Sequence, residues 1–378
     1  SSLFDEFKKE GHEVKLIYGR GPKTKHSDSF VKKTCEFESK ICHFISLFTG
    51  NMYGLMLLST NRIKREIKKT NPDIVNLHCI NGYFVNIYKL LKWLAKKNFK
   101  TVLTMHADFM MTGGCGITLD CKNYLNCQCK NCKHIKKFNG RLSLNRTHHF
   151  YNKMAKAISL FKKENISISC VSPWLSTRYN ESPIYSNIKV RTILNPVDSF
   201  FFGKPSSNPF SGKNNCLYVT PDINDYVKCG WLIKDIAKNR PDINFYVVCS
   251  NDIDYKFEEK NITYIKGGLS KQELLNYYYH SDSTIILSKT ETFSMVVAES
   301  LACGTPVYGF KCGGPESICL DEFCNFSKFG DIENLSRNLS ITVADRDLVR
   351  KLAFEKYNVE IVAKDYLDLY FKTITEGN

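Results

Sequence analysis

The stretch SKTETFSMVVAESLACGTPV, from Ser288 to Val307, decides the expected fold because it places two carboxylates, Glu291 and Glu299, along a predicted helix. Eight residues of helix correspond to roughly 12 Å of rise and about 80° of rotation, so both side chains lie on nearly the same side. This spacing suits an elongated ligand such as a nucleotide sugar, with one carboxylate at the sugar and the other at a ribose. Three backbone N–H groups at the helix N-terminus would favour a diphosphate between them, those of Phe293, Ser294 and Met295. The alternative is a pair of solvated carboxylates on an amphipathic helix.

Around this stretch, helices and strands alternate along almost the whole chain, which favours parallel sheets in an α/β fold. Apolar runs predict strands over 74–78, 101–106, 166–171, 216–220, 244–249, 283–287 and 306–310. Helices are predicted over 57–69, 83–97, 152–163, 227–239, 271–279 and 292–303, and at the end over 348–357 and 361–373. A strand normally opens such a sheet, and the first predicted element is a helix over residues 1–10. We therefore expect the first domain to lack its first strand.

A change in composition divides the chain into two predicted domains. The segment 193–198 has the pattern of a crossing, and Pro, Ser, Gly and Asn are frequent just after it, over 204–215. At 378 residues the chain exceeds the size of one ordinary core. The predicted boundaries are 1–195, 196–358 and a last helix at 359–378 that crosses back to the first domain.

The net charge of +15 is distributed unevenly, because Lys and Arg greatly outnumber acidic residues in 1–195 but not in 196–378. Such asymmetry predicts an anionic partner for the first half, which is a nucleic acid, a membrane surface or an acidic substrate. A run of about 20 apolar residues that could span a bilayer is missing from the sequence. The nearest approach, 41–58, is interrupted by His43 and Asn51. It predicts either a surface helix or loop, of interfacial character, or a buried core helix.

Sixteen cysteines in a chain of this length favour a reduced, cytosolic protein over a disulfide scaffold. Five of them fall in the predicted loop 112–133, which is more than one tetrahedral zinc needs. The CxxC spacing at its end favours a structural zinc, with ligands Cys115, Cys121, Cys129 and Cys132 and with Cys127 as a substitute. A metal-free loop of reduced thiols is the equal alternative.

Several short motifs carry a resemblance to a known family. They are PDIVNLH (72–78), TMH (104–106), NPVD (195–198), the acidic stretch itself and GGPE (313–316). In this combination the chain resembles the retaining nucleotide-sugar glycosyltransferases of family four, which have the GT-B fold. Two more motifs, NGYFVNI (81–87) and TGGC (112–115), are similar to the colanic-acid, capsule and O-antigen type of bacterial polysaccharide glycosyltransferase.

The resemblance implies an α/β protein with two Rossmann-like, doubly wound domains that face a central cleft. It implies transfer of a sugar from a UDP-, GDP- or TDP-linked donor to a lipid-linked oligosaccharide, with the anomeric configuration retained and without a catalytic metal. The implied location is the cytoplasmic, inner face of the cell membrane. The basic first half would then dock on anionic lipid, and nucleic acid would not be a partner.

Carried onto this sequence, the resemblance assigns four roles. Glu291 would contact the transferred sugar, Glu299 the ribose hydroxyls, and His106 would face the donor sugar at the end of a strand. Lys228 would neutralise the departing diphosphate, because a fixed cation stabilises charge that grows in the transition state.

Three positions depart from the family pattern. The Arg that usually precedes the lysine is absent from the corresponding region, 220–222, which reads TPD. Ser294 stands where a Gly is usual. Ala107 replaces the Asp that usually follows the histidine, and Asp108 is displaced by one residue. Asp108 is then the candidate base or orienting residue near the acceptor.

Two other classes of protein compete with this interpretation. A basic, zinc-containing nucleic-acid-binding protein would use the same positive half, but the Cys-rich loop lacks a helix with interleaved Arg and aromatic residues, and the two carboxylates stay unexplained. A GT-B phosphorylase or epimerase would need its own acid or cofactor residues, for which the sequence gives no sign.

Overall fold

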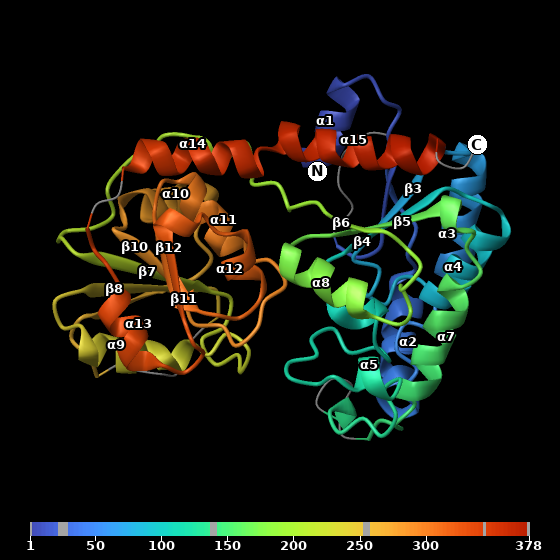
Figure 1. Ribbon diagram of the computed structural model, residues 1–378, viewed down its shortest axis with the longest axis horizontal. Helices are drawn as coiled ribbons and strands as arrows, with labels where there is room; N and C mark the ends of the chain where they lie inside the picture. Colours follow the sequence, from blue (N-terminus) through green and yellow to red (C-terminus); the bar gives the residue numbers. More distant parts are fainter. Residues whose placement is uncertain (1, 22–28, 137–141, 252–257, 343–344, 376–378) are drawn as a thin grey trace.

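The computed structural model describes residues 2–21, 29–136, 142–251, 258–342 and 345–375. They form two α/β domains side by side, with the last two helices running across the top of both (Figure 1). The expected GT-B architecture of two Rossmann-like domains is therefore confirmed.

The C-terminal domain contains six parallel strands in the order β12-β11-β10-β7-β8-β9. Their bounds are β7 Asn215–Thr220, β8 Asn244–Cys249, β9 Ile262–Lys266, β10 Ser283–Ile286, β11 Val307–Phe310 and β12 Cys324–Ser327. The order reverses between β7 and β10, and ligands of doubly wound folds bind outside the carboxyl ends of the strands at such a switch point. The covering helices are α9 Ile233–Asn239, α10 Lys271–His280, α11 Met295–Ala302, α12 Gly314–Ile318, α13 Ile332–Asn338 and α14 Arg346–Tyr357.

The N-terminal domain contains a four-stranded parallel sheet in the order β3-β4-β5-β6 and a separate parallel pair, β1-β2. The strands are β1 Leu16–Tyr18, β2 Phe30–Lys32, β3 Val75–His78, β4 Thr101–Met105, β5 Ile166–Cys170 and β6 Val190–Thr192. The helices are α1 Ser2–Lys9, α2 Glu36–Thr49, α3 Leu57–Thr70, α4 Ile87–Lys96, α5 Asn123–Asn126, α7 Thr147–Ile158 and α8 Pro173–Glu181. Every residue of β4 is buried, as expected for a parallel strand with both faces covered.

The last helix, α15 (Val359–Thr375), lies along the N-terminal domain beside α1 (Figure 1). Its apolar face packs with Val102 of β4 in one core cluster. Near its end, the Tyr370 hydroxyl accepts a hydrogen bond of 2.6 Å from the amide of Asn76, and the hydroxyls of Thr373 and Ser167 lie 2.8 Å apart. The chain therefore returns to its first domain after completing the second.

The apolar run 41–58 is not one helix, so the alternative of a buried core helix there is wrong. α2 ends at Thr49 because Gly50 adopts a left-handed conformation (φ 65°) and its N–H bonds back to Ser46. The next helix, α3, begins at Leu57. Among the described residues, no helix combines the length and the apolar character that crossing a membrane requires.

Candidate active site

Lys228 and Glu291 meet at the switch point of the C-terminal sheet. Lys228 follows β7 and Glu291 follows β10, which are adjacent parallel strands, so both residues leave the same edge of the sheet. The Lys228 Nζ atom lies 2.9 Å from Oε1 of Glu291, which also accepts a hydrogen bond of 2.6 Å from the Ser288 hydroxyl. The Glu291 side chain is only 11% exposed. The two expected ligand-binding charges are thus held together in one site.

A tight turn fixes the position of Lys228. The carboxylate of Asp225 accepts hydrogen bonds from the backbone N–H groups of Val227 (2.6 Å) and Lys228 (3.2 Å). The hydroxyl of Tyr218, on β7, donates to the Lys228 carbonyl at 3.1 Å. Because its backbone is held at both polar groups, the lysine presents its ammonium group from a rigid base.

Glu291 and Glu299 do not share a helix, so the expected helical geometry of this pair is wrong. α11 begins only at Met295, and Glu291 instead forms a parallel bridge with Gly313. Its N–H donates to the carbonyl of Cys312 at 2.9 Å, and its carbonyl accepts from Gly314 at 2.7 Å. These backbone bonds compete with the first helical turn, and they hold Glu291 in an extended segment ahead of the helix.

Ser294, at the start of α11, is unusual in both its side chain and its backbone. Ser294 is the N-cap residue, but its side chain makes no cap, and its buried hydroxyl has no hydrogen-bond partner among the described residues. Its φ of 83° lies in a region that favours glycine, the residue usual at this position in the resembled family, so the backbone is strained there. Of the other two expected residues, Phe293 is buried and Met295 is partly exposed. The positive end of the helix dipole points to this place.

Glu299 lies one helical turn further along α11 than the helix start. The hydroxyl of Tyr278 donates to its Oε2 atom at 3.2 Å. Burial raises the pKa of Glu299 to about 7, and the nearby negative charge of Asp198 contributes in the same direction. This carboxyl group therefore titrates near neutrality.

Replacing Glu299 with Gln will remove part of the pH dependence of stability. The folded protein binds this proton more tightly than the unfolded chain, whose pKa lies near 4.5, so the stabilisation is full below pH 4.5 and is lost as the pH rises through about 7. From pH 4.5 to about pH 8, the free energy of unfolding of the wild type should fall by about 3 kcal/mol relative to Glu299→Gln. Urea denaturation of both proteins measures this difference, and parallel pH profiles would contradict it.

His106 lies at the end of β4, as expected, and the structure adds a second histidine that we did not predict as a site residue. Nδ1 of His78, at the end of the neighbouring β3, is 3.2 Å from Nε2 of His106. Desolvation lowers the pKa of His106 to about 4, and desolvation together with the His106 charge lowers that of His78 to about 3. Both shifts favour the neutral form of the ring at physiological pH. The signal for this pair in the sequence was that two neighbouring parallel strands each end in His.

Thr292, next to Glu291, forms two hydrogen bonds between the domains. Its hydroxyl donates to the carbonyl of His106 at 2.8 Å, and its carbonyl accepts from the Ser172 hydroxyl at 2.6 Å. Nearby, a Cβ on Gly313 would lie 2.5 Å from the Trp174 ring, so only glycine permits this close approach. The segment that carries Glu291 and the histidine end of β4 are therefore adjacent across the domain boundary.

Asp108 is not available as a free base in this arrangement. It is buried, and its Oδ2 atom accepts hydrogen bonds from the N–H (3.0 Å) and hydroxyl (2.8 Å) of Thr118 and lies 3.1 Å from Nη2 of Arg178. Arg178 in turn lies over the rings of Trp174 and Tyr124. The geometry gives Asp108 a positioning role, in which it ties the Cys-rich loop to α8.

The Cys-rich loop gathers its thiols around one small hollow. Four cysteines and a histidine are among the residues that line it, namely Cys115, Cys121, Cys129, Cys132 and His134. Within the described part of the chain, however, no three Cys, His, Asp or Glu side chains come together in an arrangement that could hold a metal ion. Burial raises the pKa of Cys129 to about 12, which favours its protonated thiol. The structural zinc stays a prediction.

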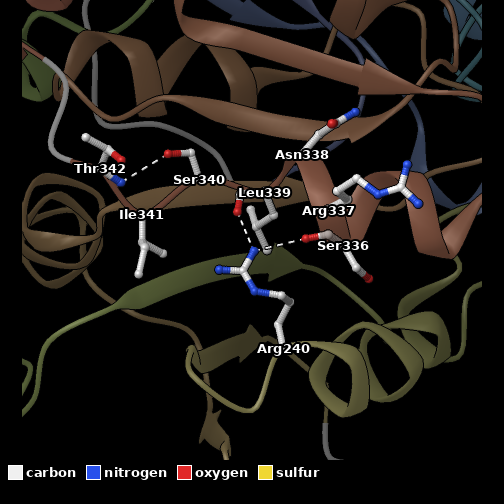
Figure 2. Close-up of a pocket in the computed structure, with 8 residues that line it drawn as sticks. All are labelled: Arg240, Ser336, Arg337, Asn338, Leu339, Ser340, Ile341 and Thr342. Atoms are coloured by element: carbon white, nitrogen blue, oxygen red, sulfur yellow. Dashed lines mark hydrogen bonds between the residues drawn. The ribbon is translucent and has the colours of Figure 1, made fainter.

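A separate groove lies near the amino ends of the strands of the C-terminal sheet (Figure 2). Its residues are Arg240 and the segment 336–342, and Arg240 precedes the amino end of β8, whereas the switch point is at the carboxyl ends. The guanidinium group donates to the carbonyls of Ser336 and Leu339 and pairs with Asp242. Arg240 therefore closes the end of α13, and the groove is not part of the site.

Two family models match the chain, one over each domain. The model "Glycosyltransferase Family 4" matches residues 2–199, and the model "Glycosyl transferases group 1" matches residues 232–358. The chain belongs to glycosyltransferase family 4. Both models describe glycosyltransferases.

Sequence relatives of this family 4 chain are distant. It is 26% identical over 160 residues to an uncharacterized glycosyltransferase of Haemophilus influenzae, a match that covers 38% of the chain and 43% of the relative. It is also 26% identical over 104 residues to the N-acetyl-alpha-D-glucosaminyl L-malate synthase of Bacillus anthracis, covering 25% of the chain and 27% of the relative. The chain thus matches less than half the length of either relative.

Solved structures share the fold of the family 4 chain. Sucrose-phosphate synthase from Thermosynechococcus elongatus aligns with a TM-score of 0.65 and 13% identity, over 99% of this chain and 92% of that one. HepE of Anabaena in complex with UDP-glucose aligns with a TM-score of 0.55 and 13% identity, over 85% and 84%. At these identities the likeness concerns the fold alone.

Proposed function

We propose that the protein is a retaining glycosyltransferase that moves a sugar from a nucleoside-diphosphate sugar to a lipid-linked oligosaccharide in the synthesis of a bacterial surface polysaccharide. The observation that carries this proposal is the meeting of Lys228 and Glu291 at the switch point, with the start of α11 just after them. A cation and a helix N-terminus in one place can bind the diphosphate of such a donor, and the carboxylate beside them can bind its sugar.

Each group has a defined task in this proposal. Lys228 here neutralises Glu291, and a diphosphate, which carries more negative charge, competes for the ammonium group and leaves the carboxylate to accept hydrogen bonds from the sugar. The N–H groups at the start of α11 donate to the phosphates, as does the Ser294 hydroxyl, which has no partner in the part of the chain that the structure describes. These donors supply hydrogen bonds in a region where the usual Arg is missing.

The ribose and the acceptor occupy the two ends of the site. Glu299, ionised, accepts hydrogen bonds from the ribose hydroxyls in the way acidic residues do in dinucleotide-binding folds. The neutral His106 ring faces the sugar from the N-terminal domain, and the acceptor enters between the domains. HepE, a protein of the same fold, is described with UDP-glucose bound, which agrees with a nucleotide-sugar donor.

A ligand screen tests this function against the nucleic-acid alternative. At saturating UDP-, GDP- or TDP-glucose, one of the three should raise the Tm by several degrees, because ligand binding to the folded state alone stabilises it. Retention is tested by NMR of the early product, whose anomeric configuration should equal that of the donor. A salt-dependent gel shift with duplex DNA, without any Tm response to the three donors, would contradict the proposal.

A further inference from the structure

α2 presents its large apolar side chains to the outside. The exposed residues follow one another at helical spacing and define the apolar face of α2, namely Phe37, Ile41, Phe44, Ile45 and Phe48. Phe37 is 72% exposed and Phe44 61%. The buried side of the same helix carries small residues instead, namely Ser39, Cys42 and Ser46. An amphipathic helix normally turns its large apolar stripe to the core, so this orientation indicates that something else covers the outer face.

The apolar surface continues beyond both ends of α2. At its start, the backbone N–H of Leu58, a 60% exposed residue, donates to the Glu38 carboxylate. At its end, the N–H of Leu144, 61% exposed, donates to the carbonyl of Phe48 at 3.0 Å. Isolated exposed apolar residues are ordinary, but a group of neighbouring ones marks an interaction surface.

Basic residues flank this patch. The exposed side of α3 carries Leu58 and, at helical spacing after it, three cations. Exposed Lys and Arg of α2, α3 and the segment before α7 are Lys40, Arg62, Arg65, Lys68, Lys69 and Arg146.

The acidic residues of α2 and α3 all form ion pairs or hydrogen bonds within the protein. Glu36 pairs with Lys32, and both oxygens of Glu38 accept hydrogen bonds at the start of α3. Glu66 is buried and pairs with two lysines of the β1-β2 region, Lys15 and Lys33. The surface that remains is apolar and positively charged.

We propose that the apolar face of α2 inserts into the interfacial layer of a membrane rich in anionic lipid, with Arg62 and Arg65 of α3 at the headgroups. A charged rim around an apolar helix face is typical of helices that lie in the membrane interface. Phosphate headgroups complement the rim, whereas a second copy of this chain would bring the same positive charges together. The inference stands on the surface itself and does not rest on the donor chemistry.

The buried side of α2 connects this surface to the cleft. The Ser39 hydroxyl donates to the Tyr83 carbonyl at 2.6 Å, and the rings of Tyr83 and Tyr53 and then of Tyr53 and Phe109 are neighbours, with centroids 5.3 and 5.8 Å apart. Phe109 follows His106 by three residues. Insertion of α2 would therefore hold the acceptor side of the cleft close to the membrane, where a lipid-linked acceptor lies.

Vesicle flotation of the full chain tests the proposal. The protein should float with vesicles of phosphatidylcholine and phosphatidylglycerol in equal amounts, and much less with phosphatidylcholine alone or at high salt. The double variant Phe44→Ser/Phe48→Ser should bind at least about tenfold more weakly, because it removes inserted apolar area. Arg62→Gln/Arg65→Gln should weaken binding to the mixed vesicles by about thirtyfold and leave binding to neutral vesicles unchanged.

A matched control carries the same chemical change elsewhere. Phe354→Ser/Phe371→Ser removes two exposed phenylalanines of α14 and α15 and should float as the wild type does. Equal flotation of Phe44→Ser/Phe48→Ser and wild type, or equal recovery with neutral and anionic vesicles, would overturn the proposal. It would also be overturned if light scattering showed a dimer that Phe44→Ser/Phe48→Ser dissociates, since the face would then be covered by a second copy.

Discussion

Replacing Glu291 with Gln will lower kcat/KM by about 10²–10³-fold while the protein stays folded, since preorganised charges at a reacting centre contribute on this scale. Gln keeps the size of the side chain and can still accept the Ser288 hydrogen bond, so the change removes mainly the negative charge. Lys228→Met should cause a loss of similar size, because it removes the cation that pairs with Glu291 and that is offered to the diphosphate. Steady-state kinetics with the donor found in the ligand screen measure both effects.

The double variant Glu291→Gln/Lys228→Met separates a shared site from two independent effects. Residues that act as a unit are not additive, so the double variant should lose about as much as either single variant. Lys238→Met provides the control, because the exposed Lys238 pairs with Glu259 on the same domain, away from the switch point. Full activity of Glu291→Gln, or a control that loses as much, would contradict the site.

The sequence predicted the fold well because its signals are local. Strands of a parallel sheet are short apolar runs between helices, and β4 and β10 are buried along their whole length. The pattern also placed His106 at the end of such a run, whereas the role of Lys228 was implied by the resemblance to the family. Carboxyl ends of parallel strands meet at one edge, so the pairing of Lys228 with Glu291 is a direct result of strand order.

Other parts of the site depend on contacts that local patterns do not contain. The delayed start of α11 results from the strained backbone of Ser294 and from the bridge between Glu291 and Gly313, which lies 22 positions away. The bonds of Thr292 cross the domain boundary to residues more than 100 positions earlier. α2 was hard to recognise because its apolar face is turned outward, so its pattern resembles that of a core helix.

Asp108 shows the same limit, since its position next to His106 suggested a base and its surroundings indicate a positioning residue. Arg178→Met should lower the free energy of unfolding by about 3–5 kcal/mol, because it leaves the buried Asp108 charge without a cation. Asp108→Asn should cost less, since Asn can still accept from Thr118 and the guanidinium group of Arg178 keeps its contact with the Trp174 ring. Urea denaturation measures both losses.

The stability of the double variant Arg178→Met/Asp108→Asn tests the buried ion pair, and the kinetics of Asp108→Asn test whether this carboxylate is a base or a positioning residue. With both charges gone, stability should recover to within about 1–2 kcal/mol of the Asp108→Asn protein, because no buried charge is left unpaired. A positioning residue predicts that Asp108→Asn lowers kcat by less than about tenfold and leaves the pH profile of kcat unchanged, since general bases contribute about 10²–10⁴-fold. A loss in that higher range, together with the disappearance of one limb of the pH profile in a stably folded Asp108→Asn protein, would restore Asp108 as the base.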